Sequence, residues 1–174
     1  MKIKKKFEPI VSGISAAFVI GLLAFLTLET SSGIWLMFSF GATIFIVFVL
    51  YTLETAQPKN IFFGHLISIL VGIIFNETIG LSFYSLGLSV GVAVILMVYF
   101  KVMHPPAASN PLVVLSMDLS FDYILFPVVA GSIIIILSSG PIKIFVNDIS
   151  PCLYPDKTLS NSENTLLSSF NCLI

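Results

Sequence analysis

Five long apolar segments constrain this chain more than any other feature of its sequence. They cover about residues 12–28, 33–53, 62–79, 86–102 and 123–146. Each is close to the ~20 residues that an α-helix needs to cross ~30 Å of hydrocarbon. The segments do not alternate between apolar and polar residues, as the shorter strands of a membrane β-barrel would. Since a helix satisfies its own backbone hydrogen bonds in lipid, the pattern predicts about five transmembrane helices.

The composition supports the same class of protein. Of the 174 residues, 57% are hydrophobic and only 10% are charged, and the mean hydropathy is +1.06. A soluble domain of this size would expose large apolar patches and aggregate. We therefore predict an all-α polytopic membrane helix bundle, with the lipid bilayer as its main partner. The net charge of −1 gives no indication of a nucleic acid partner, and we expect none.

The lysines predict an orientation. Lysines crowd residues 2–6, and two more, Lys59 and Lys101, lie in later connections between apolar segments. The positive-inside rule then favours a cytoplasmic N-terminus in an inner or plasma membrane, with both connections on the same side. Residues 103–120 look too short and too broken to cross, so we expect the chain to leave the bundle on the outer side.

The two ends of the chain differ in character. A basic start before an apolar run is also typical of a cleaved signal peptide, but residues 12–28 reach spanning length and no clear A-x-A site follows, so we expect an uncleaved helix. We expect a transmembrane domain over residues 1–147 and a loose tail over 148–174, rich in Ser, Asn and Pro. In this tail, Cys152 and Cys172 could pair on an oxidising side or remain two free thiols.

Small residues recur every four positions along three of the segments. The longest stripe lies on the third predicted helix, which suggests that this helix is central and has neighbours on that face. The stripes are Gly13, Ala17 and Gly21; Gly64, Ser68, Gly72, Asn76 and Gly80; and Gly87 and Gly91. Such stripes let helix backbones approach closely in lipid, within one bundle or between chains.

The stretch "KVMHPPAASNPLVVL" interrupts the apolar pattern directly after the fourth segment. The prolines at 105–106 have no amide hydrogen and cannot continue a helix interior. His104 precedes a proline, which biases it away from helical dihedral angles. We therefore expect the fourth helix to end near Met103.

A short helix is predicted to follow this break. Asn110 before Pro111 is typical of an N-cap and a first helical residue, with the helix continuing to about Met117. Its free amides would form a positive end that can hold an anion, and broken backbone is tolerated in a membrane only inside protein or beside water. The break is thus a candidate transport site, or else an ordinary cytoplasmic loop. Its candidate residues are His104, Pro105, Pro106, Ala107, Ala108 and Ser109.

A second interruption, "TLETAQPKNIFFGHLIS", joins the second and third helices. We expect a helix to end at Gln57 and Asn60 to cap the next one. At 100° per residue, His65, Gly72 and Asn76 lie within an arc of roughly 40° on the third helix. Polar residues on one face of a membrane helix usually point toward partners or a water path, although a lone histidine is more often a structural hydrogen-bonding group. Gln57, Asn60, His65 and Asn76 complete the set of candidate substrate-binding residues.

Catalytic and metal-binding patterns are poor. The chain has two histidines and two tail cysteines, which do not form a credible zinc set. No serine lies in a nucleophile-elbow context, and no glycine-rich phosphate loop is present. We therefore expect no enzyme activity, no metal and no cofactor.

Two motifs in order resemble the HPP family of small integral membrane proteins. "AQPKNIFFGHLIS" at 56–68 is similar to the family's AQP-x-N and Gly-His stretch, and "HPPAAS" at 104–109 contains its His-Pro-Pro motif. "FSFGAT" at 38–43 resembles its small-residue stretch in the second helix. The resemblance covers roughly residues 33–147 and departs after Ala108. It implies four core helices, here preceded by one more, and a role in transporting a small anion such as nitrite.

Two functions follow from these features. The first is a transporter or channel for a small inorganic anion, with nitrite as the example that the resemblance implies. Because nitrite is a weak base, proton-coupled passage through His65 or His104 is compatible with it. Five helices make a thin wall for a path, so we expect a homo-oligomer. The alternative is a non-transporting membrane subunit that packs against a partner protein through its glycine-rich helix faces.

Overall fold

The computed structural model describes residues 2–29 and 35–149, with side chains described over residues 9–29 and 35–140. These residues form helices and connections, without a strand among them, so the predicted all-α bundle is confirmed. In chain order the elements are α1 (Lys2–Glu29), α2 (Phe38–Val49), η1 (Glu54–Ala56), α3 (Pro58–Thr78), α4 (Phe83–Tyr99), η2 (Pro105–Ser109), α5 (Asn110–Met117), η3 (Ile124–Val129) and α6 (Ala130–Ile149). The prediction of a loose tail over residues 148–174 and the question of Cys152 and Cys172 lie almost wholly outside the described residues.

Two helices, over Pro9–Glu29 and Pro58–Thr78, are long and apolar enough to cross a membrane by length and composition. Three shorter apolar helices accompany them, over Phe38–Val49, Phe83–Tyr99 and Ile124–Gly140. Large apolar side chains cover the outside of the bundle, including Phe18 on α1, Phe83 on α4 and Leu137 on α6. In lipid this outer surface is solvated by acyl chains, so its exposure is the expected arrangement.

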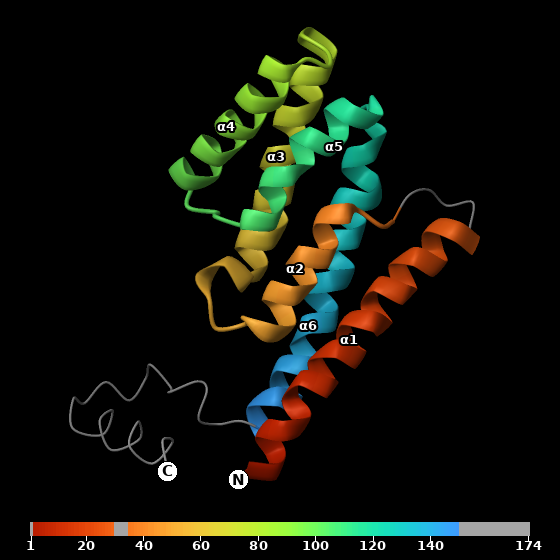
Figure 1. The fold of residues 1–174 in the computed structure, drawn as a ribbon, viewed down its shortest axis with the longest axis vertical. Helices are drawn as coiled ribbons and strands as arrows, with labels where there is room; N and C mark the ends of the chain where they lie inside the picture. The colour runs from red at the N-terminus through yellow and green to blue at the C-terminus, as the bar shows by residue number, and fades with distance from the viewer. Residues whose placement is uncertain (1, 30–34, 150–174) are drawn as a thin grey trace, which may run out of the picture.

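The helices run alternately up and down, and the chain returns to the end where it started (Figure 1). The last turns of α6 lie beside the first turns of α1, and the two helices are in contact. The expectation that the chain leaves the bundle on the side opposite to its N-terminus is therefore wrong. It failed because residues 103–120 do carry the chain back toward the opposite end.

That return is made by two short helices joined end to end. η2 and α5 together extend the chain by roughly 22 Å, from rises of about 2.0 and 1.5 Å per residue. α5 ends at Asp118, which has a left-handed backbone conformation (φ 51°) and whose amide donates to the Val114 carbonyl. α2, α3 and α4 all contact this broken segment. Its irregular backbone is therefore covered by protein, as the interior of a membrane requires.

α3 is the central helix, as its stripe of small residues predicted. It contacts α4, α5, α6, η1, η2 and η3. A Cβ added at Gly72 would lie 2.9 Å from the Pro111 Cα atom, and one at Gly64 would lie 2.7 Å from the His104 Cβ atom. Glycine at these two positions lets η2 and α5 approach the α3 backbone closely.

The connection between α3 and α4 explains why these helices form a tight antiparallel pair. Gly80 ends α3 with a positive φ of 74°, and its amide donates to the Phe75 and Asn76 carbonyls. Ser82 then starts α4 with a capping box, in which Ser82 and Ser85 each bind the other's backbone amide. Four residues are therefore enough to reverse the chain at the membrane surface.

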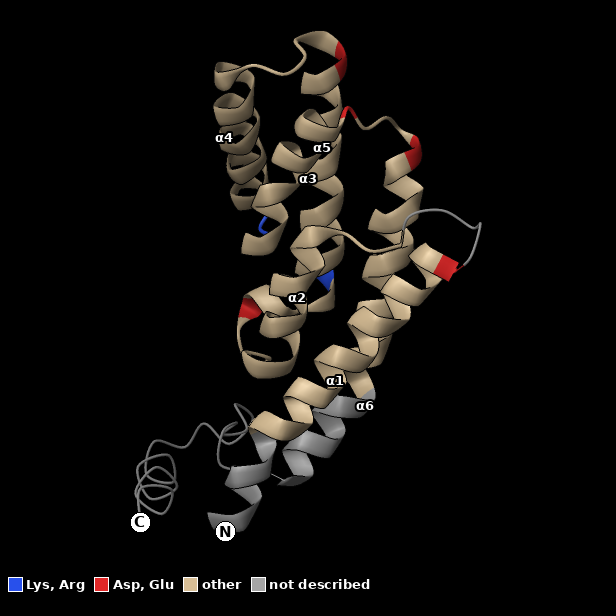
Figure 2. Cartoon of the chain, turned by 45° about the vertical axis from the view of Figure 1, so that its right-hand side comes forward, with Lys and Arg blue, Asp and Glu red and all other residues tan. Residues whose placement is uncertain are grey.

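Charged residues separate the two ends of the bundle. Lys59 in the first turn of α3 and Lys101 just after α4 lie at one end of this helix pair, together with Glu54 of η1, and we call this the lysine end. At the opposite ends of the helices lie Glu29, the last residue of α1, Glu77 in the last turn of α3, and Asp118 and Asp122 between α5 and η3, and we call this the acidic end. Figure 2 shows acidic residues in red at the upper helix turns and at the end of α1, and also in the turn below α2. Among the residues with described side chains, the acidic end has no lysine.

Candidate functional site

The two histidines of the chain meet inside the bundle, around one threonine. The His65 and His104 ring centroids are 5.0 Å apart. The Thr43 Oγ1 atom lies 2.9 Å from Nε2 of His65 and 2.9 Å from Nε2 of His104. α2, α3 and the start of η2 each supply one of these residues. The two proline-interrupted stretches therefore bring their histidines together.

The partners of these atoms fix which ring nitrogen carries hydrogen when both histidines are neutral. Nδ1 of His104 lies 2.8 Å from the Thr55 carbonyl oxygen, which only accepts, so Nδ1 donates and Nε2 keeps a lone pair. The Thr43 hydroxyl therefore donates to Nε2 of His104. Because this hydroxyl has one hydrogen, Nε2 of His65 must donate to Thr43. The hydrogen bonds thus run in one direction, from His65 through Thr43 to His104.

Asn110 continues this set of hydrogen bonds on the other side of His65. Its side-chain amide donates to Nδ1 of His65 at 3.0 Å and to the Ser68 hydroxyl at 2.7 Å. Ser68 in turn donates to the His65 carbonyl at 3.0 Å. The Asn110 Oδ1 atom is buried and has no hydrogen-bond partner among the described residues. We call these five residues the histidine cluster: Thr43, His65, Ser68, His104 and Asn110.

The histidine cluster is closed to solvent. Four of its members are 0% exposed, and His104 is 1% exposed. The Phe40 ring packs edge-on against His65, with centroids 5.3 Å apart, and Gly64 lies against His104. Toward the acidic end, Pro111 and Val114 seal the contact with Gly72. A buried polar group without a partner costs about 1–3 kcal/mol, so the mutual pairing of these side chains is what makes their burial tolerable.

The cluster lies at membrane depth. His65 is the eighth residue of α3, so its Cα lies ~10 Å along the helix axis from Pro58. About 20 Å of α3 remain between His65 and Thr78. Hydrocarbon offers no hydrogen bonds at this depth, and the bundle encloses the polar groups on all sides.

The face of α3 that holds His65, Gly72 and Asn76 carries three contacts with α5 and its C-cap residue. His65 contacts Asn110, Gly72 contacts Pro111, and Asn76 donates to an Asp118 carboxylate oxygen at 2.8 Å. The order of these contacts means that α3 and α5 run parallel. Asn76 belongs to the far end of this face, at the acidic end, so the structure separates it from the histidine cluster.

Gln57 and Asn60 lie at the lysine end and outside the cluster. Gln57 is exposed and is the residue before α3. The expected capping role of Asn60 is wrong: Asn60 is the third residue of α3, and its side chain donates to the Glu54 carbonyl at 2.7 Å, which ties α3 to η1. Both residues border the connection that supplies the Thr55 carbonyl to His104.

The His-Pro-Pro segment forms a helical turn instead of an open loop. Pro105, Pro106, Ala107, Ala108 and Ser109 make up η2, in which the Ala107 amide donates to the His104 carbonyl and the Ser109 hydroxyl to the Pro106 carbonyl. The Ala107 amide is therefore engaged within the turn. The segment's clear contribution to the cluster is to hold His104 at its start and Asn110 at its end.

Three members of the histidine cluster were not among the predicted site residues. Asn110 was expected to cap the short helix, but Ser109 precedes the helix and Asn110 is its first residue, which frees the side chain for His65. Ser68 was assigned to the packing stripe. Thr43 ends the "FSFGAT" stretch, so the resemblance itself contained a signal for it.

The described residues offer no alternative centre of metal chemistry. Among them, no three His, Cys, Asp or Glu side chains lie close enough to hold an ion. The histidine cluster consists of hydrogen-bonding side chains, which are uncharged when each imidazole carries one hydrogen.

A helical bundle with lipid-facing surfaces and a buried polar cluster defines a polytopic integral membrane protein. The chain belongs to the HPP family, since the family described as "HPP, transmembrane region" matches residues 2–150. This match includes α1, so the expectation that the first helix precedes the family's region is wrong.

The chain is also similar to two proteins of Dictyostelium discoideum, each described only as a transmembrane protein. One is 30% identical over 129 residues, covering 70% of this chain and 42% of that protein. The other is 28% identical over 124 residues, covering 67% of this chain and 44% of that protein. The chain thus spans less than half the length of these curated relatives. No solved structure matches the chain.

Proposed function

We propose that this protein carries a small inorganic anion across the membrane, with nitrite as the first candidate. The observation that supports the proposal is the histidine cluster, a closed set of neutral polar groups at membrane depth. Polar side chains inside membrane bundles commonly mark ion or substrate paths, because they are expensive to bury and packing does not require them.

The cluster has groups suited to a small anion. Hydroxyl, imidazole and amide hydrogens are supplied by Thr43, His65 and Asn110, and each can be offered to an oxygen atom of a solute. A small ion needs a few such donors and no large pocket. The closed geometry then corresponds to a state between openings toward the two membrane sides.

Two short segments are the natural gates in this proposal. Toward the lysine end, the Thr55 carbonyl binds His104, and the Val102 carbonyl lies against Gly64 next to it. Toward the acidic end, α5 covers the cluster through Pro111 and Val114. Movement of α5 along α3 would open the second side without breaking a long helix.

Transport accounts for the cluster better than catalysis does. The hydrogen bond between the Thr43 hydroxyl and a histidine is also a feature of nucleophile–base pairs. A nucleophile, however, needs an open side toward its substrate, and Thr43 Oγ1 is surrounded by His65, His104 and the Ser39 carbonyl. We therefore propose a transporter, without enzyme activity.

Anion flux into liposomes tests this proposal. The purified protein is reconstituted, and uptake of nitrite, nitrate and chloride is measured against protein-free liposomes. We expect His65→Ala and His104→Ala to lower nitrite uptake by at least about tenfold, because each removes hydrogen bonds that are worth ~1–3 kcal/mol. Thr78→Val is the matched control, since Thr78 lies at the acidic end and donates only to the Ile74 carbonyl. Uptake equal to that of protein-free liposomes for all three anions would reject the proposal.

A second function is favoured by the outward-facing glycines. An added Cβ at Gly13, Gly21, Gly87 or Gly91 would meet no described atom within 4 Å. α1 and α2 also border a groove of about 660 Å³ that contains Gly13 and Gly41. These faces suit contact with another helix, in a homo-oligomer or in a complex where this chain is a non-transporting subunit. Crosslinking in native membranes separates the two, because only the second gives a stoichiometric foreign partner.

A further inference from the structure

We propose that His104 binds the proton that accompanies each transported anion, and that Thr43 accommodates this proton by turning its hydroxyl to the Ser39 carbonyl. The anion coupling rests on the proposed function. The proton site itself rests only on the geometry of the histidine cluster and is testable without transport.

In the neutral cluster, one nitrogen atom can gain a proton without leaving a donor unpaired. Nε2 of His104 has a lone pair that accepts from the Thr43 hydroxyl at 2.9 Å. The same Thr43 oxygen lies 3.1 Å from the Ser39 carbonyl oxygen, in hydrogen-bond geometry. Thr43 therefore has a second acceptor for its single hydrogen, one helical turn back on α2.

A proton on His104 then leaves every donor paired. Nε2 becomes a donor, the Thr43 hydroxyl turns to the Ser39 carbonyl, and Thr43 Oγ1 accepts from both imidazole rings. Nδ1 of His104 continues to donate to the Thr55 carbonyl. The step adds one proton to the Nε2 lone pair and rotates one hydroxyl, and no other bond is broken.

A proton on His65 requires a larger rearrangement. Its free position is Nδ1, which faces the NH2 group of Asn110 at 3.0 Å, so a donor would face a donor. Turning the Asn110 amide over would relieve that contact. It would also place the NH2 group where Oδ1 has no partner, and Ser68 would have to give up its hydrogen bond to the His65 carbonyl in order to donate to the turned amide oxygen. His104 is therefore the residue of the pair that gains a proton first.

The surroundings leave the charge of that proton available for an anion. The groups facing His104 are the Thr43 hydroxyl from α2, His65 and Gly64 from α3, and the Thr55 carbonyl from η1. Asn110 is the polar neighbour of His65 on α5. The charged residues of the adjoining connections, Glu54, Lys59 and Lys101, are exposed. With no fixed cation inside the described part of the bundle, one proton on His104 would balance one monovalent anion.

Nitrogen NMR of labelled histidine tests the proton site directly. The chain contains two histidines, so two sets of ring signals are expected from the 174-residue chain in lipid bilayers, and His65→Gln assigns them. Near neutral pH we expect His104 as the Nδ1–H form and His65 as the Nε2–H form. On acidification, the His104 signals should change to the charged form before those of His65. The reverse order, or the opposite pair of ring forms, would overturn the proposal.

Variants of Thr43 test its part in accommodating the proton. Thr43→Val keeps the shape and removes the hydroxyl, so charging His104 should require about tenfold more protons, as expected for one lost hydrogen bond to a charged group. Thr43→Ser restores the hydroxyl and should recover most of this difference. Thr78→Val is again the control. If Thr43→Val and Thr78→Val titrate alike, Thr43 has no such role.

Coupling is measured in liposomes that contain a pH-sensitive dye. We expect each anion taken up to bring about one proton, and a clamped membrane potential to leave uptake unchanged, because the pair carries no net charge. Uptake without protons, driven by the membrane potential, would overturn the coupling and leave the proposed function standing. No anion uptake at all would reject the proposed function, and the NMR order would then decide the proton site by itself.

Discussion

Thr43 binds two histidines with a single hydroxyl group, and this hydroxyl sets the direction of the hydrogen bonds between them. Its oxygen has three polar neighbours within 3.1 Å, namely His65, His104 and the Ser39 carbonyl. One hydrogen among three neighbours means that two arrangements are available, which differ by the rotation of the hydroxyl. A side chain without a hydroxyl would separate the two rings into independent groups.

Glycine at position 64 is required by the closeness of His104. A methyl group there would lie 2.7 Å from the His104 Cβ atom and 3.2 Å from the Val102 carbonyl oxygen. We expect Gly64→Ala to destabilise the protein by about 1–3 kcal/mol, since both neighbours are fixed to the backbone and the helices must move apart. Thermal unfolding in detergent measures the change.

Gly87→Ala is the matched control for this substitution. Gly87 is also within a membrane helix, but an added Cβ meets no described atom within 4 Å. Alanine has the higher helix propensity, so we expect this variant to be as stable as the parent or slightly more stable. Equal unfolding temperatures for Gly64→Ala and the parent would show that the close contact with His104 does not exist.

Sequence alone predicts the two histidines as site residues but not the groups that join them. His65 and His104 stand beside proline interruptions, and such breaks in apolar segments are conspicuous. Thr43 and Ser68 lie in helices that no break marks, and small polar residues are common in membrane helices as packing residues. Their role depends on how three helices meet, which periodicity along one helix does not determine.

At the scale of elements, the parallel contact of α3 with α5 organises the bundle. A hydrogen bond between Asn76 and Asp118 joins the two helices at the acidic end, and one between His65 and Asn110 joins them inside the bundle. The sequence predicts the start and end of α5 to within a residue, because Pro111 favours a helix start. It does not predict that η2 and α5 return the chain across the bundle. Their combined length looks too short for a return across the bundle until the 3₁₀ helix η2, with its larger rise per residue, is counted.

The turn between α3 and α4 gives a prediction at the same scale. Ser82→Ala removes a hydroxyl that accepts from the Ser85 amide and starts α4. We expect a loss of about 1 kcal/mol in the free energy of unfolding, as for other N-cap serines. Urea or thermal unfolding in detergent measures it, with Ser116→Ala as the control, because Ser116 is an exposed residue of α5. A Ser82→Ala variant no less stable than the control would contradict the capping role.

At the scale of the whole molecule, the chain starts and ends its helical part at the same end of the bundle. This follows from the position of α6 beside α1 and from the return made by η2 and α5 (Figure 1). We expect the lysine end and the acidic end to face different compartments. The positive-inside rule favours the lysine end as the cytoplasmic one.

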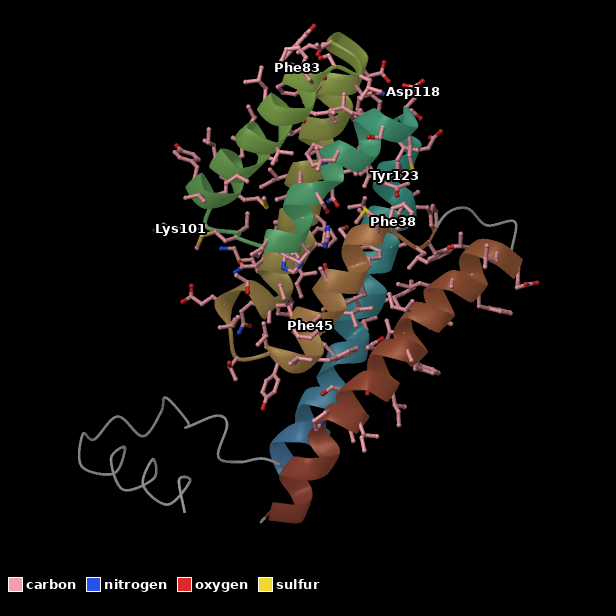
Figure 3. The ribbon with its side chains drawn as sticks, viewed as in Figure 1. Phe38, Phe45, Phe83, Lys101, Asp118 and Tyr123 are labelled. Atoms are coloured by element: carbon pink, nitrogen blue, oxygen red, sulfur yellow. The ribbon has the colours of Figure 1, made fainter. Side chains whose placement is uncertain are left out.

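Labelling of single cysteines tests this topology. With Cys152 and Cys172 replaced by serine, cysteine is introduced at Lys101, just after α4, or at Asp118, just after α5, which Figure 3 shows well apart, with Asp118 near the top and Lys101 at mid-height. A reagent that cannot cross the membrane should label one of them in intact cells and the other only after lysis. Tags at both chain ends should share the compartment of position 101. Labelling of both positions from one side would contradict a path in which η2 and α5 return the chain to the acidic end.

The separation of charge has a further consequence for any anion that approaches. Lys59 and Lys101, offset in part by Glu54, would enrich anions over the lysine end, and Glu29, Glu77, Asp118 and Asp122 would deplete them over the opposite end. In the transport that we propose, anions would then load faster from the side of the lysine end when their concentrations on the two sides are equal. Screening by salt, over a Debye length of about 8 Å at physiological ionic strength, would level that bias and leave the thermodynamic balance point untouched.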